Sequence, residues 1–335
     1  MRSLFARIPV RGIALFAVAL LVPTIFASSA AAGAASTSQG DRTIQRYDRE
    51  GLLLLTRRYL AALVAHDPTA VPLARGIRTV ENLQQIAPGQ GLWATATGGP
   101  TSFAIYVPDP QLQTAGFIGV MEQNGAPILL GLRLKMEDGK ITEAEHLIAS
   151  GLTETNLANL QTPRPGLLAE IPRGQRLPEH KLREIGATYY NALDDNVAGE
   201  APFAADCERH ENGIVTAGPN LPPPPPESGI PAVATDCIGQ IDSKVFTYIE
   251  TIGNRRVFAA DPVTGLAIGL SQFHQPMDNI PYEITLANGT TEMYAPNFPP
   301  FDLPAAHIWK IGPDHQLHEI EAMGFVAPLN SPSGW

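Results

Sequence analysis

Two segments far apart in the chain carry apolar residues with the spacing of an α-helix. They cover residues 48–65 and 179–194, and in both of them apolar side chains recur every three or four positions. In the first segment these are Leu52, Leu55, Tyr59, Leu60, Leu63 and Val64, and in the second they are Leu182, Ile185, Tyr189 and Ala192. Each pattern therefore predicts a helix that packs one face against a core.

Each helical segment is followed, further along the chain, by two apolar runs with a short turn between them. In the first half the runs are 130–136 and 141–148, and in the second half they are 307–311 and 317–325. Asp138-Gly139 forms part of the first turn, and Asp-Gly between apolar runs is a strong signal for a β-hairpin. Helices followed by antiparallel strands in both halves predict an α+β fold class.

The two halves form an internal repeat. A shift of 130 residues, which brings Tyr59 onto Tyr189, also brings Glu81-Asn82 onto Glu211-Asn212, and seven aligned residues are identical without any gap. We therefore predict two tandem modules, module one at residues 41–152 and module two at residues 178–328. The segment between them, 153–177, contains several prolines and little strand pattern, which predicts a linker that lies on the surface.

The N-terminus has the three parts of a secretory signal peptide. Arg2, Arg7 and Arg11 precede an uncharged run over residues 12–27, and small residues with Ala-x-Ala sites follow up to residue 34. The alternative is a membrane anchor, but the run is shorter than the roughly 18 to 20 residues that a bilayer span needs. We predict a signal peptide at residues 1–34, a secreted or periplasmic protein, and no stable membrane insertion.

Composition and charge narrow the classes of function. Hydrophobic residues make up 44% and charged residues 17% of the chain, which is typical of a globular protein and excludes disorder. The formal net charge of −10 becomes −13 once the three signal-peptide arginines are removed, and an acidic chain without a basic run predicts no nucleic-acid partner. The sequence has no Gly-rich phosphate loop, Gly-x-Ser-x-Gly or His-Glu-x-x-His, so cofactor-free acid–base chemistry is the remaining enzymatic option.

Cys207 and Cys237 are the two cysteines of the chain. In an exported protein, an isolated pair is more often a disulfide than two free thiols, so we predict that they are bonded to each other. A nucleophilic cysteine is the alternative. The chain has no Cys-x-x-Cys and no cysteine spacing typical of a metal site.

Module two carries a set of motifs with a recognisable order. They are Asp206-Cys207-x-Arg209-x-Glu211-Asn212-Gly213, Cys237-x-x-Gln240-Ile-Asp-Ser243, Phe246-x-Tyr248-Ile249, and Arg255-Arg256 followed by Asp261 and Gly265. Together they resemble a family of secreted bacterial and fungal proteins of mostly unassigned function. The family's Phe-Asp-His is replaced here by Phe273-His274-Gln275, so a role carried by that aspartate does not transfer to this chain.

The order of helices and antiparallel strands also resembles the nuclear transport factor 2-like superfamily, which includes ketosteroid isomerase, scytalone dehydratase and SnoaL-like polyketide cyclases. It is similar, too, to lyases that release formaldehyde from lignin dimers without a cofactor. The resemblance implies two cone-shaped modules, each with helices packed on a strongly bent antiparallel sheet. It further implies a deep cavity with apolar walls and a few polar groups.

Such a cavity suits a cofactor-independent lyase, isomerase or dehydratase that acts on a small apolar or aromatic molecule, because burial shifts side-chain pKa values toward the working pH. The alternative is a non-catalytic secreted module that binds a hydrophobic ligand or a protein partner. In both cases we expect the two modules to pack as an intramolecular pseudo-dimer, a state compatible with further homo-oligomers.

Three residues of module two are candidates for catalysis. His210 follows Arg209 and precedes Glu211, which makes it a candidate acid or base, with an exposed loop histidine as the alternative. The phenol of Tyr190, on the second helix, can donate a hydrogen bond to a developing oxyanion. Arg256 can hold a substrate oxygen, with a structural ion pair as the alternative.

Five further residues are candidates for substrate binding, namely Tyr248, His274, Arg255, Glu211 and Asp206. Arg255 and Arg256 are consecutive in an extended segment, so their side chains point to opposite faces and at most one of them enters the cavity. Tyr248 and His274 are otherwise ordinary strand residues. Asp206 and Glu211 can pair with a buried arginine.

His315, His318, Glu319 and Glu321 lie within seven residues and raise the question of a metal site. On an extended strand, however, the two histidines would point to opposite faces. We therefore expect a charged hairpin here and no metal.

Overall fold

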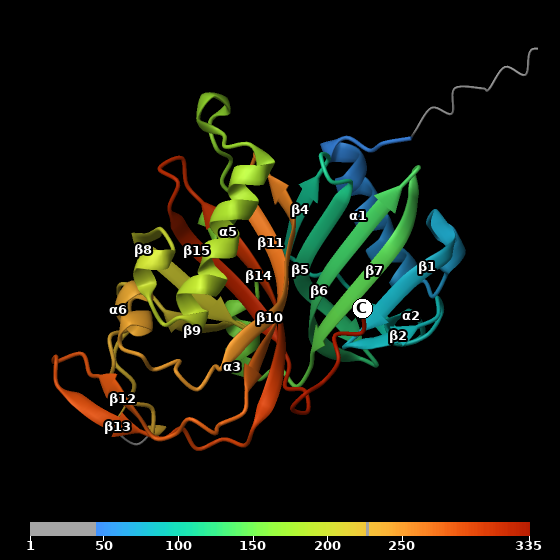
Figure 1. Cartoon of the computed structure of the whole chain (residues 1–335). Helices are drawn as coiled ribbons and strands as arrows, with labels where there is room; N and C mark the ends of the chain where they lie inside the picture. Colours follow the sequence, from blue (N-terminus) through green and yellow to red (C-terminus); the bar gives the residue numbers. More distant parts are fainter. Residues whose placement is uncertain (1–44, 226–227) are drawn as a thin grey trace, which may run out of the picture. The chain divides into compact units, whose positions relative to one another are not determined.

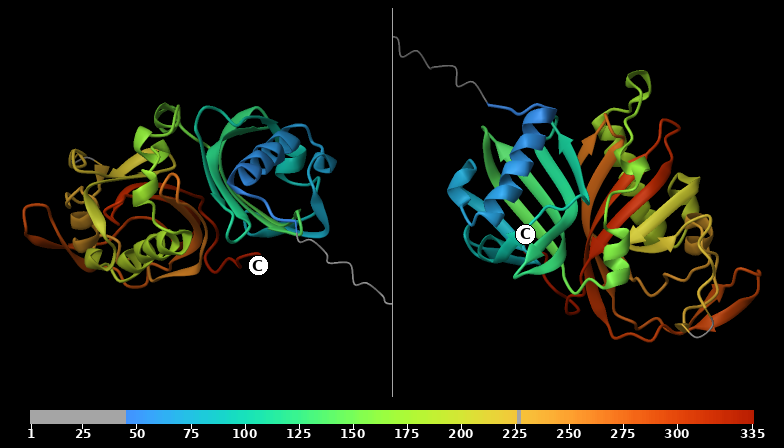
Figure 2. Two further views of the ribbon diagram at one scale, coloured as in Figure 1. Left: turned by 90° about the horizontal axis from the view of Figure 1, so that it is seen from above. Right: turned by 180° about the vertical axis from the view of Figure 1, so that it is seen from behind.

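The computed structural model describes residues 45–225 and 228–335, so the predicted signal peptide lies outside the described residues. The chain folds into two strongly curled sheets, and Figure 2 shows a long helix on the concave side of each of them. The fold class of two cone-like α+β modules is thus confirmed (Figure 1). None of the described helices is both long and apolar enough to cross a membrane.

Module one begins with the predicted helix and continues into a seven-stranded sheet of order β2-β1-β7-β6-β5-β3, in which β4 also pairs with β5. The first strand pairs with the last in parallel, and the other pairs are antiparallel. Its elements are α1 (Arg49–Val64), η1 (Pro68–Ala70), β1 (Leu73–Glu81), β2 (Gln84–Ile86), α2 (Leu92–Thr95), β3 (Ala96–Gly98), β4 (Ala104–Asp109), β5 (Thr114–Gln123), β6 (Ala126–Glu137) and β7 (Lys140–Ala149).

Module two repeats this plan in a six-stranded sheet of order β10-β11-β14-β15-β8-β9. Its elements are α5 (Glu179–Asp194), η3 (Ala198–Glu200), β8 (Phe203–Glu211), β9 (Ile214–Ala217), α6 (Cys237–Asp242), β10 (Thr251–Asp261), β11 (Leu266–Gln275), β14 (Phe301–Ile311) and β15 (Leu317–Gly324). A separate two-stranded hairpin of β12 (Tyr282–Thr285) and β13 (Thr291–Tyr294) is inserted before β14.

The identical residues of the repeat occupy the same structural positions. Both Asn82 and Asn212 follow the first strand of their sheet with positive φ angles of 42° and 48°. The side chain of Asn82 bonds to the backbone N–H and carbonyl of Ile148, and that of Asn212 does the same with Gly324. Each asparagine therefore joins the first strand to the last, and asparagine is suited to this place because it tolerates the left-handed conformation.

The segment between the modules contains short helices and a few buried side chains. It contains α3 (Glu154–Asn159), α4 (Pro165–Leu168) and η2 (Arg173–Gln175), and Leu160, Leu167 and Ile171 are buried. Arg164 donates to Glu319 and to the carbonyl of Ile320 on β15. Most other residues of the segment are exposed, so it lies on the surface while three apolar side chains and this arginine attach it to module two.

Two reciprocal ion pairs connect the modules. Arg49 of α1 pairs with Asp261 at the end of β10 at 2.8 Å, and Arg183 of α5 pairs with Asp109 at the end of β4. Both aspartates are buried, and burial raises the pKa of Asp109. Apolar residues of both sheets also share one buried cluster, so the contact between the modules combines packing with buried charge pairs.

Candidate functional site

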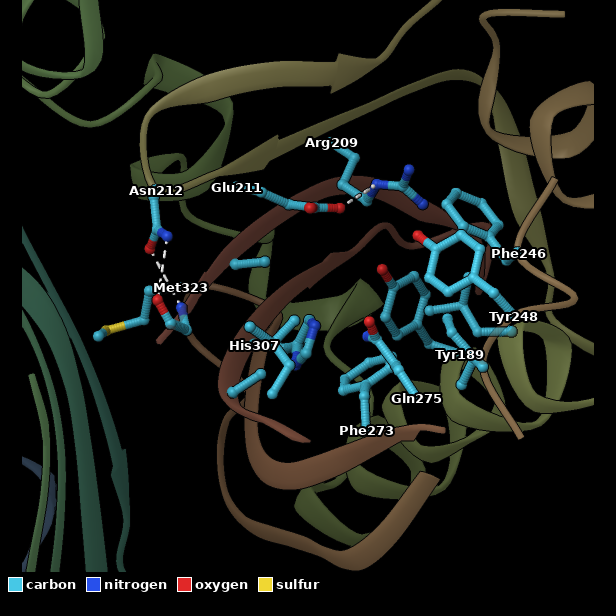
Figure 3. Close-up of a pocket in the computed structure, with 16 residues that line it drawn as sticks. Tyr189, Arg209, Glu211, Asn212, Phe246, Tyr248, Phe273, Gln275, His307 and Met323 are labelled. Carbon is cyan, nitrogen blue, oxygen red and sulfur yellow. Dashed lines mark hydrogen bonds and ion pairs between the residues drawn. The ribbon is translucent and has the colours of Figure 1, made fainter. Parts of the chain in front are cut away.

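A cavity of about 170 Å³ lies in module two between α5 and the concave face of the sheet. Side chains from β8, β11 and β14 enter it at alternate positions, as the two-residue period of a strand requires. Its walls are largely apolar and aromatic, with a few polar groups among them (Figure 3). The lining residues are Tyr189, Leu193, Arg209, Glu211, Asn212, Phe246, Tyr248, Ile249, Phe273, Gln275, Leu303, Ala305, His307, Ala322, Met323 and Gly324.

Arg209 is the charged group inside this wall, and 98% of it is buried, since its relative exposure is 2%. Its guanidinium donates to the hydroxyl of Thr216 at 3.0 Å and to the side-chain oxygen of Gln240, and it pairs with Glu211 at 3.0 Å. A buried guanidinium is stable only when its charge and hydrogen bonds are satisfied in this way. Glu211 is 47% exposed, so the ion pair lies where the cavity meets solvent.

The disulfide Cys207–Cys237 holds this part of the wall together, which confirms the predicted pairing. It joins β8 to the first residue of α6, and Gln240 in the same short helix bonds to Arg209 and to the carbonyl of Thr216. The chain then continues from α6 into the segment that supplies Phe246, Tyr248 and Ile249 to the cavity. The disulfide and α6 thus hold in place both Arg209 and the segment that supplies the aromatic side chains of the wall.

The other polar groups of the cavity are neutral near pH 7. Burial raises the pKa of Tyr189 to about 12, against the opposing positive charge of Arg209. Burial also raises the pKa of Tyr248, and it lowers the pKa of His307 to about 3, in the same direction as the charge of Arg209. The phenols are therefore hydrogen-bond donors, and the imidazole is uncharged.

Figure 3 shows the phenol oxygens of Tyr189 and Tyr248 and the amide of Gln275 directed toward the same space. Gln275 is 3% exposed, and its side-chain oxygen has no hydrogen-bond partner among the described residues. A buried polar atom without a partner costs about 1 to 3 kcal/mol unless a ligand or water satisfies it. The cavity therefore offers donors and an acceptor that suit a ligand with one polar end.

The structure brings two of the sequence-predicted residues to the cavity, Tyr248 and Glu211. Tyr190 is fully buried on α5, with its hydroxyl 3.4 Å from Nδ1 of His307, but it does not line the cavity. Its ring lies behind the wall, because α5 presents the neighbouring Tyr189 to the cavity. Tyr190 thus contacts His307 from outside this cavity, and together with Arg255 it lines a separate, more open pocket.

His210 points to the opposite face of β8 from Arg209. Its Nε2 lies 2.6 Å from the carboxylate of Glu208, and burial together with the charge of Arg164 lowers its pKa. The packed segment between the modules covers this outer face. His210 therefore does not reach the cavity, and the acid–base role expected for it would need a different site.

The two arginines also lie outside the cavity. Arg255 pairs with Asp194 and donates to Asn191, which ties β10 to the end of α5. Arg256 forms two hydrogen bonds of 2.6 and 2.8 Å with Glu145 of module one. Both arginines thus form ion pairs that connect structural elements, which was the alternative to a role in the cavity.

The last two candidates face outward. His274 Nδ1 lies 2.6 Å from Asp302 on the face of β11 opposite Phe273 and Gln275. Asp206 pairs with His318 at 2.7 Å on the surface. The structure thus does not bring His210, Tyr190 and Arg256 together, and the catalytic roles expected for them stay predictions.

Sequence reasoning missed Arg209, His307 and Gln275 as cavity residues, and it favoured a packing role for Tyr189. Arg209 stands in the motif between Cys207 and Glu211, and strand alternation places it on the same face as Glu211. Tyr189 was interpreted as a packing residue because the repeat matches it to Tyr59. His307 lies in an apolar run, and no motif in the sequence distinguishes it as a cavity residue.

Module one fills the equivalent space. The hydroxyl of Tyr59 lies 2.9 Å from Nε2 of His146, and Nδ1 of that imidazole lies 3.0 Å from Glu81. Trp93 of α2 is 1% exposed and packs edge-on against Tyr59, with ring centroids 5.1 Å apart. The tryptophan thus packs over these polar groups.

Comparison with known proteins finds a family model that matches part of the chain and matches among solved structures. A family model described as "Domain of unknown function (DUF8021)" matches residues 175–324, less than half of the chain, in the module for which a family resemblance was expected. No curated protein matches the chain. Eight chains of solved structures match it. Among them is "a putative polyketide cyclase" from Silicibacter sp. TM1040, 12% identical, covering 44% of this chain and 90% of its own, with a TM-score of 0.27.

Proposed function

We propose that module two is a cofactor-independent acid–base enzyme whose substrate is a small, neutral aromatic carbonyl compound. The observation that supports this most strongly is the ion pair between the buried Arg209 and the solvent-facing Glu211 at the edge of an aromatic cavity. The size of the cavity, about 170 Å³, is close to the roughly 150 Å³ of an engineered cavity that holds benzene. One aromatic ring with a short polar substituent therefore fits inside.

The expected step is removal of a proton from the carbon next to the carbonyl group. Glu211 accepts the proton, and the electron pair of the C–H bond moves to the carbonyl oxygen as an enolate forms. Arg209 and the neutral phenol of Tyr189 stabilise that oxygen. Because the negative charge moves from Glu211 to the substrate, the total charge beside Arg209 does not change.

The enolate then reacts in one of two ways. It takes a proton back at another carbon, which is an isomerisation, or it expels a leaving group from the β-carbon, which is a lyase or dehydratase reaction. The shape of the cavity wall, built from scattered strand residues, selects between them. Both outcomes use the same first proton transfer.

Hydrogen exchange tests that first step without knowledge of the natural substrate. Phenylacetone in D₂O exchanges its benzylic protons, and NMR measures the rate with and without the protein. We expect acceleration by the wild type and a loss of about 10²-fold or more of that acceleration in Glu211→Gln. Glu208→Gln is the matched control, because Glu208 lies on the same strand but bonds to His210 on the outer face.

A second candidate function is that module two binds such a ligand without changing it. The neutral states of Tyr189 and His307 near pH 7 favour it, because groups that keep their protons are suited to holding a ligand. In that case phenylacetone binds in an Arg209-dependent manner while its exchange rate equals the rate in buffer. An exchange rate that is the same in wild type and Glu211→Gln would rule out the enzymatic proposal.

A further inference from the structure

Three aromatic side chains continue the wall of the cavity toward solvent. Tyr248 lines the cavity and packs edge-on against Phe298, with ring centroids 5.1 Å apart and an interplanar angle of 86°. Phe298 in turn packs against Phe301 at 5.6 Å. We call Tyr248, Phe298 and Phe301 the outer aromatic set.

The strand register shows that this set belongs to the same side of the sheet as the cavity. Phe301 begins β14 and is the register partner of Gln275, which lines the cavity. Leu303, Ala305 and His307 follow on β14 at alternate positions and are all lining residues. Phe301 therefore extends this row by one more inward-facing position.

Phe298 remains partly open to water, with 36% of its surface exposed. A single exposed apolar residue is common on protein surfaces and needs no explanation. Here, however, the exposed ring contacts a residue of the cavity wall on one side and Phe301 on the other. The cavity itself has room for one ring, and a larger substituent that extends past Tyr248 would contact this aromatic edge.

We propose that the outer aromatic set is a second subsite that holds another aromatic ring of the ligand. The ligand class is then a carbonyl compound with two aromatic rings joined by a short linker. The first ring occupies the cavity, and the second packs edge-to-face on Phe298 and Phe301, which is the arrangement that aromatic pairs favour. This inference rests on the proposed function of the same site.

Two ketones that differ by one ring test the subsite. Phenylacetone carries one ring and 1,3-diphenylacetone carries two, and calorimetric titration gives the affinity of each. We expect 1,3-diphenylacetone to bind the wild type about tenfold more tightly. Phe298→Ala should lose most of this gain and keep the affinity for phenylacetone, whereas Met293→Ala, a control at a residue that is 63% exposed on β13, should keep both.

The possible results separate the two proposals. If phenylacetone binds and Phe298→Ala retains the full gain from the second ring, the subsite is overturned and the proposed function stands. An equal affinity of the wild type for the two ketones has the same meaning. If neither ketone binds the wild type, the proposed function and the subsite are both overturned.

Discussion

The guanidinium of Arg209 donates a hydrogen bond to the side chain of Gln240, and each residue lies within three positions of a disulfide cysteine. The pair connects a covalent cross-link to the polar end of the cavity. Because Gln240 also donates to the carbonyl of Thr216 at 2.9 Å, it is fixed on both sides. Together with Thr216 and Glu211, Gln240 thus orients the guanidinium of Arg209 in the cavity wall.

Replacement of Gln240 by alanine should therefore weaken both folding and binding. It leaves a buried donor of Arg209 without an acceptor, which costs about 1 to 3 kcal/mol of the free energy of unfolding. We also expect a lower affinity for phenylacetone, because the guanidinium is no longer held in place. Urea denaturation and calorimetry measure the two effects, and Gln240→Glu, which keeps an acceptor, should restore the affinity. Equal affinity of wild type and Gln240→Ala would contradict a positioning role.

Loss of the disulfide should destabilise module two. Cys207 and Cys237 are separated by 30 residues, and a cross-link of that span contributes about 3 to 4 kcal/mol in the chain-entropy model. We expect Cys207→Ser/Cys237→Ser to lose about this much free energy of unfolding in urea. The affinity for phenylacetone should fall as well, since α6 carries Gln240 and leads into the aromatic wall. A variant as stable as the wild type would show that packing alone holds α6 on β8.

The pH dependence of stability should contain a contribution from His307. Burial lowers its pKa in the folded protein to about 3, below the value near 6.5 expected for the unfolded chain. The unfolded state therefore binds a proton below pH 6.5 that the folded state does not, and stability is lost as the pH falls from 6.5 toward 3. Between pH 7 and pH 5 we expect the wild type to lose about 2 kcal/mol relative to His307→Gln. Parallel pH profiles of the two proteins would show that His307 does not contribute.

Glu321 should contribute a pH dependence of stability opposite to that of His307. It is 1% exposed on β15, and burial raises its pKa to about 8, assisted by the charges of Glu319 and Glu208 and opposed by that of Arg164. The folded state therefore keeps a proton that the unfolded state releases above pH 4.5, and stability is lost as the pH rises from 4.5 to 8.

Glu321→Gln keeps the shape of the protonated side chain and removes this titration. We compare the free energy of unfolding of Glu321→Gln with that of the wild type at two pH values. The advantage of the variant should be larger at pH 7 than at pH 4.5, by on the order of 3 kcal/mol. Denaturation at both pH values measures the difference. A difference that does not change with pH would mean that Glu321 is ionised in the folded protein.

The sequence was sufficient for the two helices, the hairpins, the register of the repeat and the disulfide, because each depends on local pattern or on residue type. It was not sufficient to choose the inner face of β8. Arg209 and His210 point to opposite faces, yet their exposures are 2% and 8%, because the segment between the modules covers the outer face. With both faces buried, the usual contrast between apolar and polar positions is lost, and the sequence around His210 does not show which face it occupies.

Binding of phenylacetone to two arginine variants tests the central claim most directly. Arg209→Met removes the positive charge from the cavity, whereas Arg256→Met removes an arginine that pairs with Glu145 of module one and lies outside the cavity. Calorimetry on folded protein should give a Kd at least about tenfold weaker for Arg209→Met and unchanged for Arg256→Met, a difference of about 1.4 kcal/mol. An unchanged Kd for Arg209→Met, or a loss of binding in Arg256→Met alone, would contradict the assignment of the site to the cavity of module two.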